Sequence, residues 1–108
     1  MRHEYEVQFT QAAEQQFAAL DNSDQALVVK QLEKLQTAPE LGQPLRGDLV
    51  NHRKMYAAKK RLRIVYRIEH LRVVVTVIAI GKRENEAVYR VAEAEAAHFH
   101  QRRLRRIS

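Results

Sequence analysis

The sequence contains no cysteine among its 108 residues, which excludes disulfides, cysteine-ligated zinc sites and thiol nucleophiles. It also lacks a long hydrophobic run, because the longest, Val73–Ile80, is interrupted by Thr76 and is far too short to cross a bilayer. The N-terminal segment carries charged residues where a signal peptide needs an apolar stretch. Glycine and proline are scarce, and no Gly/Ser linker divides the chain. We therefore expect a single domain over residues 1–108, soluble and cytoplasmic.

Acidic residues are scarce in the second half of the chain. Residues 1–45 carry three Lys/Arg and seven Asp/Glu, a net charge of −4, whereas residues 46–108 carry sixteen and six, a net charge of +10. A half-molecule this positive attracts phosphate polymers and acidic protein surfaces. The charge alone does not distinguish between these two kinds of partner.

The first forty residues predict a strand followed by two helices. Residues 3–9 alternate between apolar and polar, which is the period of a half-buried strand. Thr10 is placed to cap a first helix, and residues 22–24 end it and supply caps for a second helix, which stops before Pro39. The apolar residues at helical spacing, which we expect in the core, include Phe17, Leu20, Leu27 and Leu35.

After a connector rich in proline and glycine the period changes to two. Residues 52–56, 61–69 and 72–80 predict three strands, the last of them apolar on both faces and stopped by Gly81. From Glu84 the apolar residues return to helical spacing. The predicted order is β-α-α-β-β-β-α, an α+β domain with the two N-terminal helices packed on one face of an antiparallel sheet and a C-terminal helix.

Basic side chains gather on one face of the predicted strand 61–69. Because the apolar residues of that strand must face the helices, Arg61, Arg63 and Arg67 project together from its other face. A solvated cationic face is one explanation of these charges. The neighbouring residues favour a phosphate-binding surface for single-stranded nucleic acid. Those that we expect on or beside this face are Arg53, Lys54, Arg61, Arg63, Lys82, Arg83 and the phenol of Tyr89.

Residues 45–89 resemble the RelE/ParE superfamily of small bacterial and archaeal toxins. The matching pieces, in chain order, are Leu45-Arg46-Gly47, Arg63-Ile64-Val65-Tyr66, the apolar run into Gly81-Lys82-Arg83-Glu84, and Val88-Tyr89. The predicted order of helices and strands is also that of the family. On the RelE side, the resemblance implies a toxin that cuts mRNA on the ribosome and is held in check by a cognate antitoxin.

The resemblance also implies a chemistry that uses neither a metal nor another cofactor. The 2′-hydroxyl of one nucleotide attacks the adjacent phosphate, and cations neutralise the transition state. By position, Arg63 and Arg83 would hold the scissile phosphate, and Tyr89 would stack on a base or transfer a proton.

The strand before residue 57 supplies further candidates. Lys54 is the best match to the lysines that support the chemistry in the family, and Arg53 is the neighbour that would replace a second lysine. His52 is an alternative base, because an unperturbed imidazole titrates near neutral pH. Arg53, Arg61 and Lys82 would add contacts to RNA.

Two other functions stay open at this point. A ParE-like toxin poisons DNA gyrase and lacks the nuclease residues, so Arg63, Arg83 and Tyr89 favour the RelE side. A non-catalytic protein of the same fold would bind RNA or the ribosome without cutting. The expected partners are an acidic and partly disordered antitoxin, the ribosome and its mRNA, with no membrane and no metal.

Overall fold

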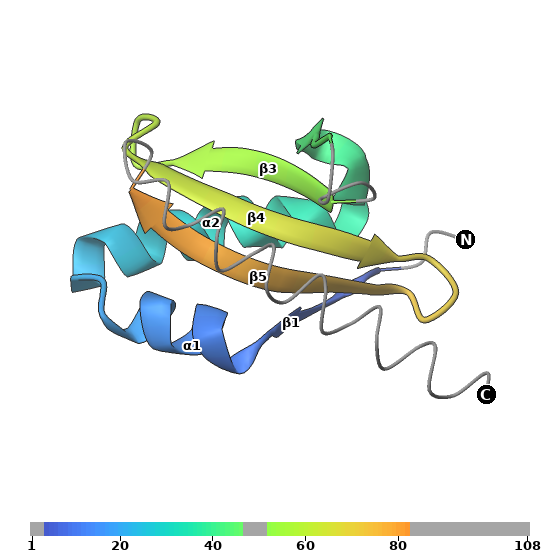
Figure 1. Ribbon diagram of the computed structural model, residues 1–108, viewed down its shortest axis with the longest axis horizontal. Coiled ribbons are helices and arrows are strands. Elements are labelled where there is room, and N and C mark those ends of the chain that lie inside the picture. The colour runs from blue at the N-terminus through green and yellow to red at the C-terminus, as the bar shows by residue number, and fades with distance from the viewer. Residues whose placement is uncertain (1–3, 47–51, 83–108) are drawn as a thin grey trace.

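The computed structural model describes residues 4–46 and 52–82 (Figure 1). The helix predicted from Glu84 lies outside these residues, as do Arg83 and Tyr89. Within them, no helix is long and apolar enough to span a membrane. The elements, in chain order, are β1 (Glu6–Phe9), α1 (Gln11–Ala18), α2 (Asn22–Thr37), the short 3-10 helix η1 (Pro39–Leu41), β2 (Gln43–Pro44), β3 (His52–Ala57), β4 (Leu62–Glu69) and β5 (Val74–Lys82).

The described strands form one five-stranded sheet with the order β1-β5-β4-β3-β2. The β2–β3, β3–β4 and β4–β5 pairs are antiparallel, but β1 runs parallel to β5. The prediction of an entirely antiparallel sheet is therefore wrong at this edge. Two helices and three strands separate β1 from β5, so no hairpin imposes antiparallel pairing, and the period of a strand does not encode its direction.

Both helices begin at side-chain caps. The hydroxyl of Thr10 accepts a hydrogen bond from the Ala13 N–H at 3.1 Å, which confirms the predicted start of α1. The cap of α2 is Asp21, whose carboxylate accepts from the Asp24 N–H at 2.8 Å. The predicted caps at residues 22–24 instead form the first turn of α2. The same N–H of Asp24 lowers the pKa of Asp21.

The core lies between the helices and one face of the sheet (Figure 1). Its buried side chains are Ala13 of α1, Val28, Leu32 and Leu35 of α2, and Met55, Ala57, Ala58, Leu62, Ile64, Tyr66, Val75, Val77 and Ile80 of the sheet and its β3–β4 turn. Phe17 and Leu20 pack against this core as predicted. The core prediction for Leu27 is wrong, because it lies one position off the buried stripe of α2 and is 41% exposed.

The strand β5 contains a shift in register and is buried on both faces. Val65 pairs with Ala79 but Tyr66 pairs with Val77, so Ile78 is an extra residue in β5. The bulge keeps Val77 on the helix side together with Ile80, although they are three residues apart. The prediction of a strand buried on both faces is confirmed, whereas Gly81 does not end it, since β5 continues to Lys82.

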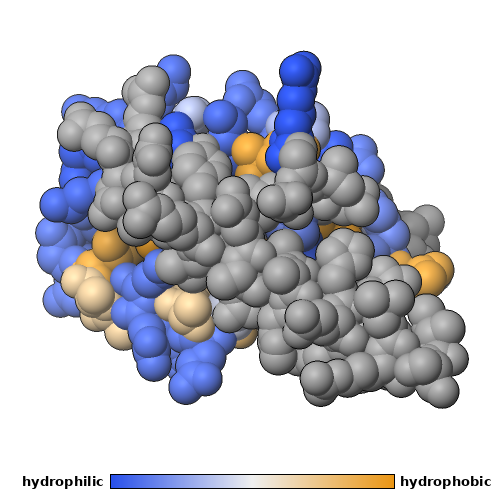
Figure 2. All heavy atoms as spheres, in the orientation of Figure 1, coloured by the Kyte–Doolittle hydropathy of each residue, from blue (hydrophilic) through white to orange (hydrophobic). Residues whose placement is uncertain are grey.

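Tyr66 connects the sheet to η1. Its side chain is fully buried, and its hydroxyl donates to the carbonyl of Pro39 at 2.7 Å while accepting from the N–H of Gly42 at 2.9 Å. Burial raises the pKa of this phenol. In Figure 2 the described part of the visible surface is mainly hydrophilic, and its hydrophobic residues appear as small patches.

Candidate functional site

Lys54, Tyr56 and Arg63 lie on the face of the sheet opposite to α1 and α2. The alternation of strands explains this placement, because the neighbouring Met55 of β3 and Ile64 of β4 are both in the core on the helix side. Tyr56 pairs directly with Arg63 across the two strands, and Lys54 is the next residue of β3 on the same face. All three side chains are half-buried. We refer to them as the cationic cluster.

The ring of Tyr56 is shared by the two cations of the cluster. The guanidinium carbon of Arg63 lies 5.4 Å from the ring centroid, and the ammonium nitrogen of Lys54 lies 5.9 Å from it. Both distances are within the range of cation–π attraction. One guanidinium nitrogen of Arg63 also donates to the Tyr56 hydroxyl at 3.4 Å. On its other side Arg63 pairs with Gly81 of β5, which adds no side chain to this row.

Arg61 does not belong to this face. It lies in the β3–β4 turn, and its guanidinium donates to the carboxylate of Asp24 at 2.8 Å, at the start of α2. This hydrogen bond raises the pKa of Arg61. The prediction that Arg61 projects together with Arg63 and Arg67 is therefore wrong. The period of β4 begins only at Leu62, and Arg61 follows a turn with a different backbone conformation.

Arg53 lies on the helix side of β3. One of its guanidinium nitrogens donates to the carbonyl of Gly42 at 2.7 Å and to that of Glu40 at 3.1 Å. Arg53 thus fixes the segment between α2 and β2. Because it faces away from Lys54, it does not supply the second cation that we expected beside that lysine. Tyr56 occupies the neighbouring position on the Lys54 face, and the sequence interpretation missed it as a site residue.

His52 and Arg67 lie at the far end of the same face. They pair with each other, four residues along β3 from Tyr56, or about 13 Å at the usual rise of a strand. The structure therefore does not bring His52 next to Arg63. Both residues are buried, with 6% and 8% of their surface exposed. Arg67 shares the face of Arg63 as predicted, but a solvated cation does not describe it, since it is buried and its Nε lies 3.7 Å from the Glu69 carboxylate.

Glu69 is the counter-charge at this end of the sheet. Its carboxylate accepts from the Thr76 hydroxyl at 2.9 Å and from Arg72 at 3.0 Å. Burial acts to raise the pKa of Glu69, but the hydrogen bonds from Thr76 and Arg72 and the charge of Arg67 outweigh it, so that its pKa is lowered. Arg67 is therefore held by the fold rather than presented to a ligand.

Lys82 ends the described part of β5. It is exposed and pairs with Leu62, which places it on the helix side of the sheet rather than on the face of Arg63. The next residue, Arg83, and the phenol of Tyr89 lie outside the described residues. Their convergence with Arg63 stays a prediction.

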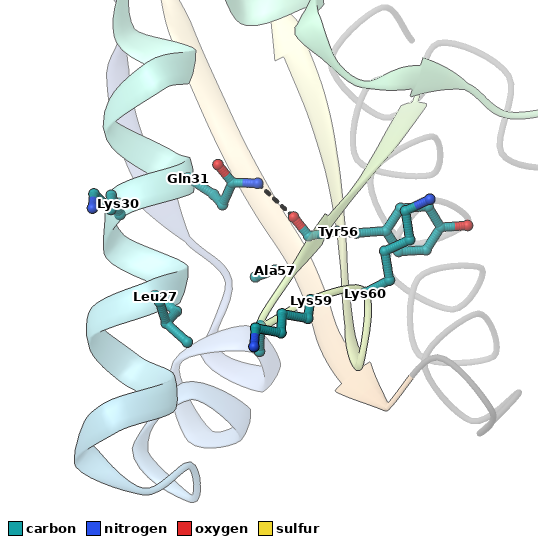
Figure 3. A pocket seen from close by; sticks show the side chains of 8 residues that line it. Leu27, Lys30, Gln31, Tyr56, Ala57, Lys59 and Lys60 are labelled. Carbon is teal, nitrogen blue, oxygen red and sulfur yellow. Dashed lines mark hydrogen bonds between the residues drawn. The ribbon is translucent and has the colours of Figure 1, made fainter.

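The turn after β3 has an unusual backbone. Ala58, Lys59 and Lys60 have φ angles of 53°, 55° and 68°, in the left-handed region that costs a residue with a side chain about 1 kcal/mol or more. Between this turn and α2 lies an open groove of about 320 Å³ (Figure 3). Its lining residues are Leu27, Lys30, Gln31, Tyr56, Ala57, Ala58, Lys59 and Lys60. In the groove, Gln31 donates to the carbonyl of Tyr56 at 2.6 Å.

Comparison with known proteins agrees with the resemblance in the sequence. The family model of the ParE toxin of the type II toxin–antitoxin system parDE matches residues 7–87. A mutant of the E. coli toxin RelE with two arginines changed to alanine, in the free state, is 27% identical, with 85% of this chain and 97% of that chain covered and a TM-score of 0.75.

Two toxin–antitoxin complexes are also similar. The intact E. coli RelBE complex matches at 28% identity over 75% of this chain and 99% of that chain, with a TM-score of 0.66. The RelBE2 complex from Mycobacterium tuberculosis matches at 26% identity over 79% and 98%, with a TM-score of 0.67. These likenesses confirm the predicted α+β fold. No curated protein sequence matches this chain.

Proposed function

Since this chain belongs to the RelE/ParE family of type II toxins, we propose that it is a RelE-like endoribonuclease that cuts mRNA on the ribosome without a metal. The observation that carries the proposal is the cationic cluster. Lys54 and Arg63 come from two neighbouring strands, share one aromatic ring and face away from the helices. A pair of preorganised cations at one point of a sheet suits a single phosphate.

The proposed reaction is an internal transfer within the RNA. The 2′-oxygen of one nucleotide attacks phosphorus, the bond to the 5′-oxygen of the next nucleotide breaks, and that oxygen takes up a proton. The products are a 2′,3′-cyclic phosphate and a 5′-hydroxyl. Negative charge builds up on the phosphate oxygens in the transition state, so donors fixed beforehand around them lower the barrier.

The residues of the cluster have distinct proposed roles. Arg63 would bind two phosphate oxygens, because a guanidinium presents two parallel N–H donors. Lys54 would add the second positive charge and is our candidate for the group that takes the 2′-hydroxyl proton. Arg83 would hold the phosphate together with Arg63, and Tyr89 would stack on a base or transfer a proton. For Arg83 and Tyr89 the support is the resemblance of their sequence motifs.

A second candidate function is inhibition of DNA gyrase. The family model that matches residues 7–87 is that of a ParE toxin, which favours this alternative. The cationic cluster and the likeness to RelE structures favour the nuclease. The two functions differ in what they break, since one leaves new ends in translated mRNA and the other leaves gyrase-dependent breaks in DNA.

We also propose a cognate antitoxin as partner. Two of the similar structures are toxin–antitoxin complexes, RelBE and RelBE2. The charge of +10 over residues 46–108 suits an acidic and partly disordered chain. Co-expression with the adjacent open reading frame should suppress toxicity and give a complex that purifies together. A chain that is harmless and purifies alone would contradict this part of the proposal.

The test of the nuclease is to map mRNA 5′ ends after induced expression of three forms of the chain. Wild type should create new 5′ ends within translated messages, and Arg63→Ala should abolish them. Arg72→Ala is the matched control, because it removes an exposed arginine of the β4–β5 turn that pairs with Glu69. It should cut like wild type. Gyrase-dependent DNA breaks without mRNA cleavage would instead identify the ParE-like function.

A further inference from the structure

We propose that Tyr56 is a positioning residue of this site, which holds Arg63 and Lys54 in the arrangement that a phosphate requires. This inference extends the proposed nuclease function, and a role of Tyr56 in catalysis depends on that function. The arrangement itself can be tested without any cleavage. The motifs that carry the family resemblance do not include Tyr56.

The argument begins with the repulsion between the two cations. Lys54 and Arg63 are diagonal neighbours on one face of an antiparallel pair, a distance at which like charges oppose each other. The face of an aromatic ring carries negative potential, and the Tyr56 ring is near both cations, 5.4 Å from the guanidinium carbon and 5.9 Å from the ammonium nitrogen. The ring therefore offsets their repulsion and keeps both side chains together before an anion binds.

The hydroxyl of Tyr56 adds direction to this attraction. It accepts a hydrogen bond from one guanidinium nitrogen of Arg63 at 3.4 Å, so one edge of the guanidinium is turned toward the phenol. A guanidinium is planar with five N–H donors, so fixing one nitrogen restricts the directions in which the others can point. A ring without a hydroxyl would still attract Arg63 but would leave its orientation less restricted.

The backbone of Tyr56 is itself fixed from the helix side. Gln31 of α2 donates to the Tyr56 carbonyl at 2.6 Å, at a level of β3 that β2 does not reach. Figure 3 shows the carbonyl turned toward Gln31 while the ring extends in the opposite direction. The next two residues, Ala57 and Ala58, are buried. The backbone that carries the Tyr56 ring is therefore held by the core and by α2.

The simpler explanation is that Tyr56 only covers the sheet. In that case any side chain of similar apolar size would replace it, and Tyr56→Leu would behave like Tyr56→Phe. A positioning role predicts that the two substitutions differ, because phenylalanine keeps the ring and loses only the hydroxyl. Leucine loses both.

The first experiment measures the arrangement by NMR on the purified chain. In wild type and in Tyr56→Phe, the Hδ protons of Arg63 and the Hε protons of Lys54 should show upfield ring-current shifts. In Tyr56→Leu these shifts should disappear while the amide spectrum stays that of the folded protein. Shifts that do not depend on the ring at position 56 would overturn the proposal.

The second experiment measures single-turnover cleavage of a defined mRNA on purified ribosomes. Tyr56→Leu should lower the maximal rate constant by roughly 10- to 100-fold, the range seen when a reacting group is misplaced by about 1 Å. The toxin concentration at half-saturation should change by less than about twofold, because ground-state binding is not the step affected. Tyr56→Phe should keep most of the rate constant. Tyr5→Leu is the control, since Tyr5 bonds to His70 and packs on the helix side.

The outcomes separate the two proposals. Weaker binding with an unchanged rate constant would overturn the positioning role and indicate that Tyr56 contacts the RNA itself. Equal rate constants for Tyr56→Leu and wild type would show that Tyr56 only covers the sheet and does not position Arg63 and Lys54. Wild type could also fail to cut RNA while the ring-current shifts still depend on Tyr56. The nuclease proposal would then fail, and the positioning of Arg63 and Lys54 by Tyr56 would remain but without a role in catalysis.

Discussion

Replacing Gly42 with alanine would place a methyl carbon 2.6 Å from the carbonyl oxygen of Lys54 and 2.6 Å from the hydroxyl oxygen of Tyr66. The φ angle of Gly42 is −74°, so the residue is not there for its backbone freedom. It is there because the segment after η1 passes very close to β3. One of the two contacts is with backbone, which cannot swing away as the end of a long side chain can.

The expected cost follows from these two contacts. Overpacking a closely packed site costs about 1–3 kcal/mol. Movement of the Gly42 segment would also weaken the hydrogen bond from its N–H to Tyr66, which contributes about 1 kcal/mol. Gly42→Ala should therefore lower the free energy of unfolding by about 2–4 kcal/mol, out of a total of about 5–15 kcal/mol for a typical domain.

Urea unfolding followed by circular dichroism measures this loss, and a double-mutant cycle tests its cause. Tyr66→Phe removes the hydroxyl oxygen and leaves the contact with the Lys54 carbonyl in place. Gly42→Ala should therefore cost less in the Tyr66→Phe background than in wild type, though still clearly more than zero. A cost below about 0.5 kcal/mol in wild type would refute the close approach of these segments, since that is the scale of an ordinary surface substitution.

Three further predictions concern the stability of the fold. Asp21→Ala should lower the midpoint of urea unfolding, since the N-cap of α2 is lost. Arg61→Ala should change the urea midpoint less than Asp21→Ala does, because the arginine of its ion pair is 63% exposed and solvent screens the pair. The lowered pKa of Glu69 contributes stability that is present above the pKa of an unfolded glutamate and is lost as the pH falls through the folded value. Thr76→Val should therefore reduce the difference between the urea midpoints at neutral and acidic pH.

The strands that form the candidate site could be predicted closely from the sequence. The predicted 52–56 and 61–69 correspond to His52–Ala57 and Leu62–Glu69, because alternation is a reliable signal wherever one face of a strand is buried. Lys54 and Arg63, which we expected on or beside one face, share a face in the structure, since both lie inside regular strands. The predicted end of β5 was less accurate, since Gly81 still pairs with Arg63 of β4.

The errors arise where the regular period stops. Arg61 comes directly after three residues with positive φ angles, and no glycine marks this turn in the sequence. The alternation of β4 was therefore extended one residue too far. The direction of β1 could not be predicted from the sequence either. The edge of a sheet accepts a parallel or an antiparallel strand, and tertiary contacts decide between the two.

Tyr56 was missed although a signal for it was present. It stands two residues after Lys54, so the two side chains had to share a face once that strand was assigned. The sequence interpretation includes Tyr56 in the strand 52–56 without a role, and takes Arg53 as the second cation. The structure separates Arg53 from Lys54 by the full thickness of the sheet, since adjacent residues of a strand point to opposite faces.

The most direct test of the nuclease is the chemistry of the ends that it leaves. Attack by the 2′-oxygen predicts cleaved mRNA with 5′-hydroxyl ends, which a polynucleotide kinase labels without prior treatment with phosphatase. With purified ribosomes and a defined mRNA, wild type should produce such ends and Arg63→Ala should not. Products with 5′-phosphate ends, or equal cleavage by wild type and Arg63→Ala, would contradict the assignment of the cationic cluster to this reaction.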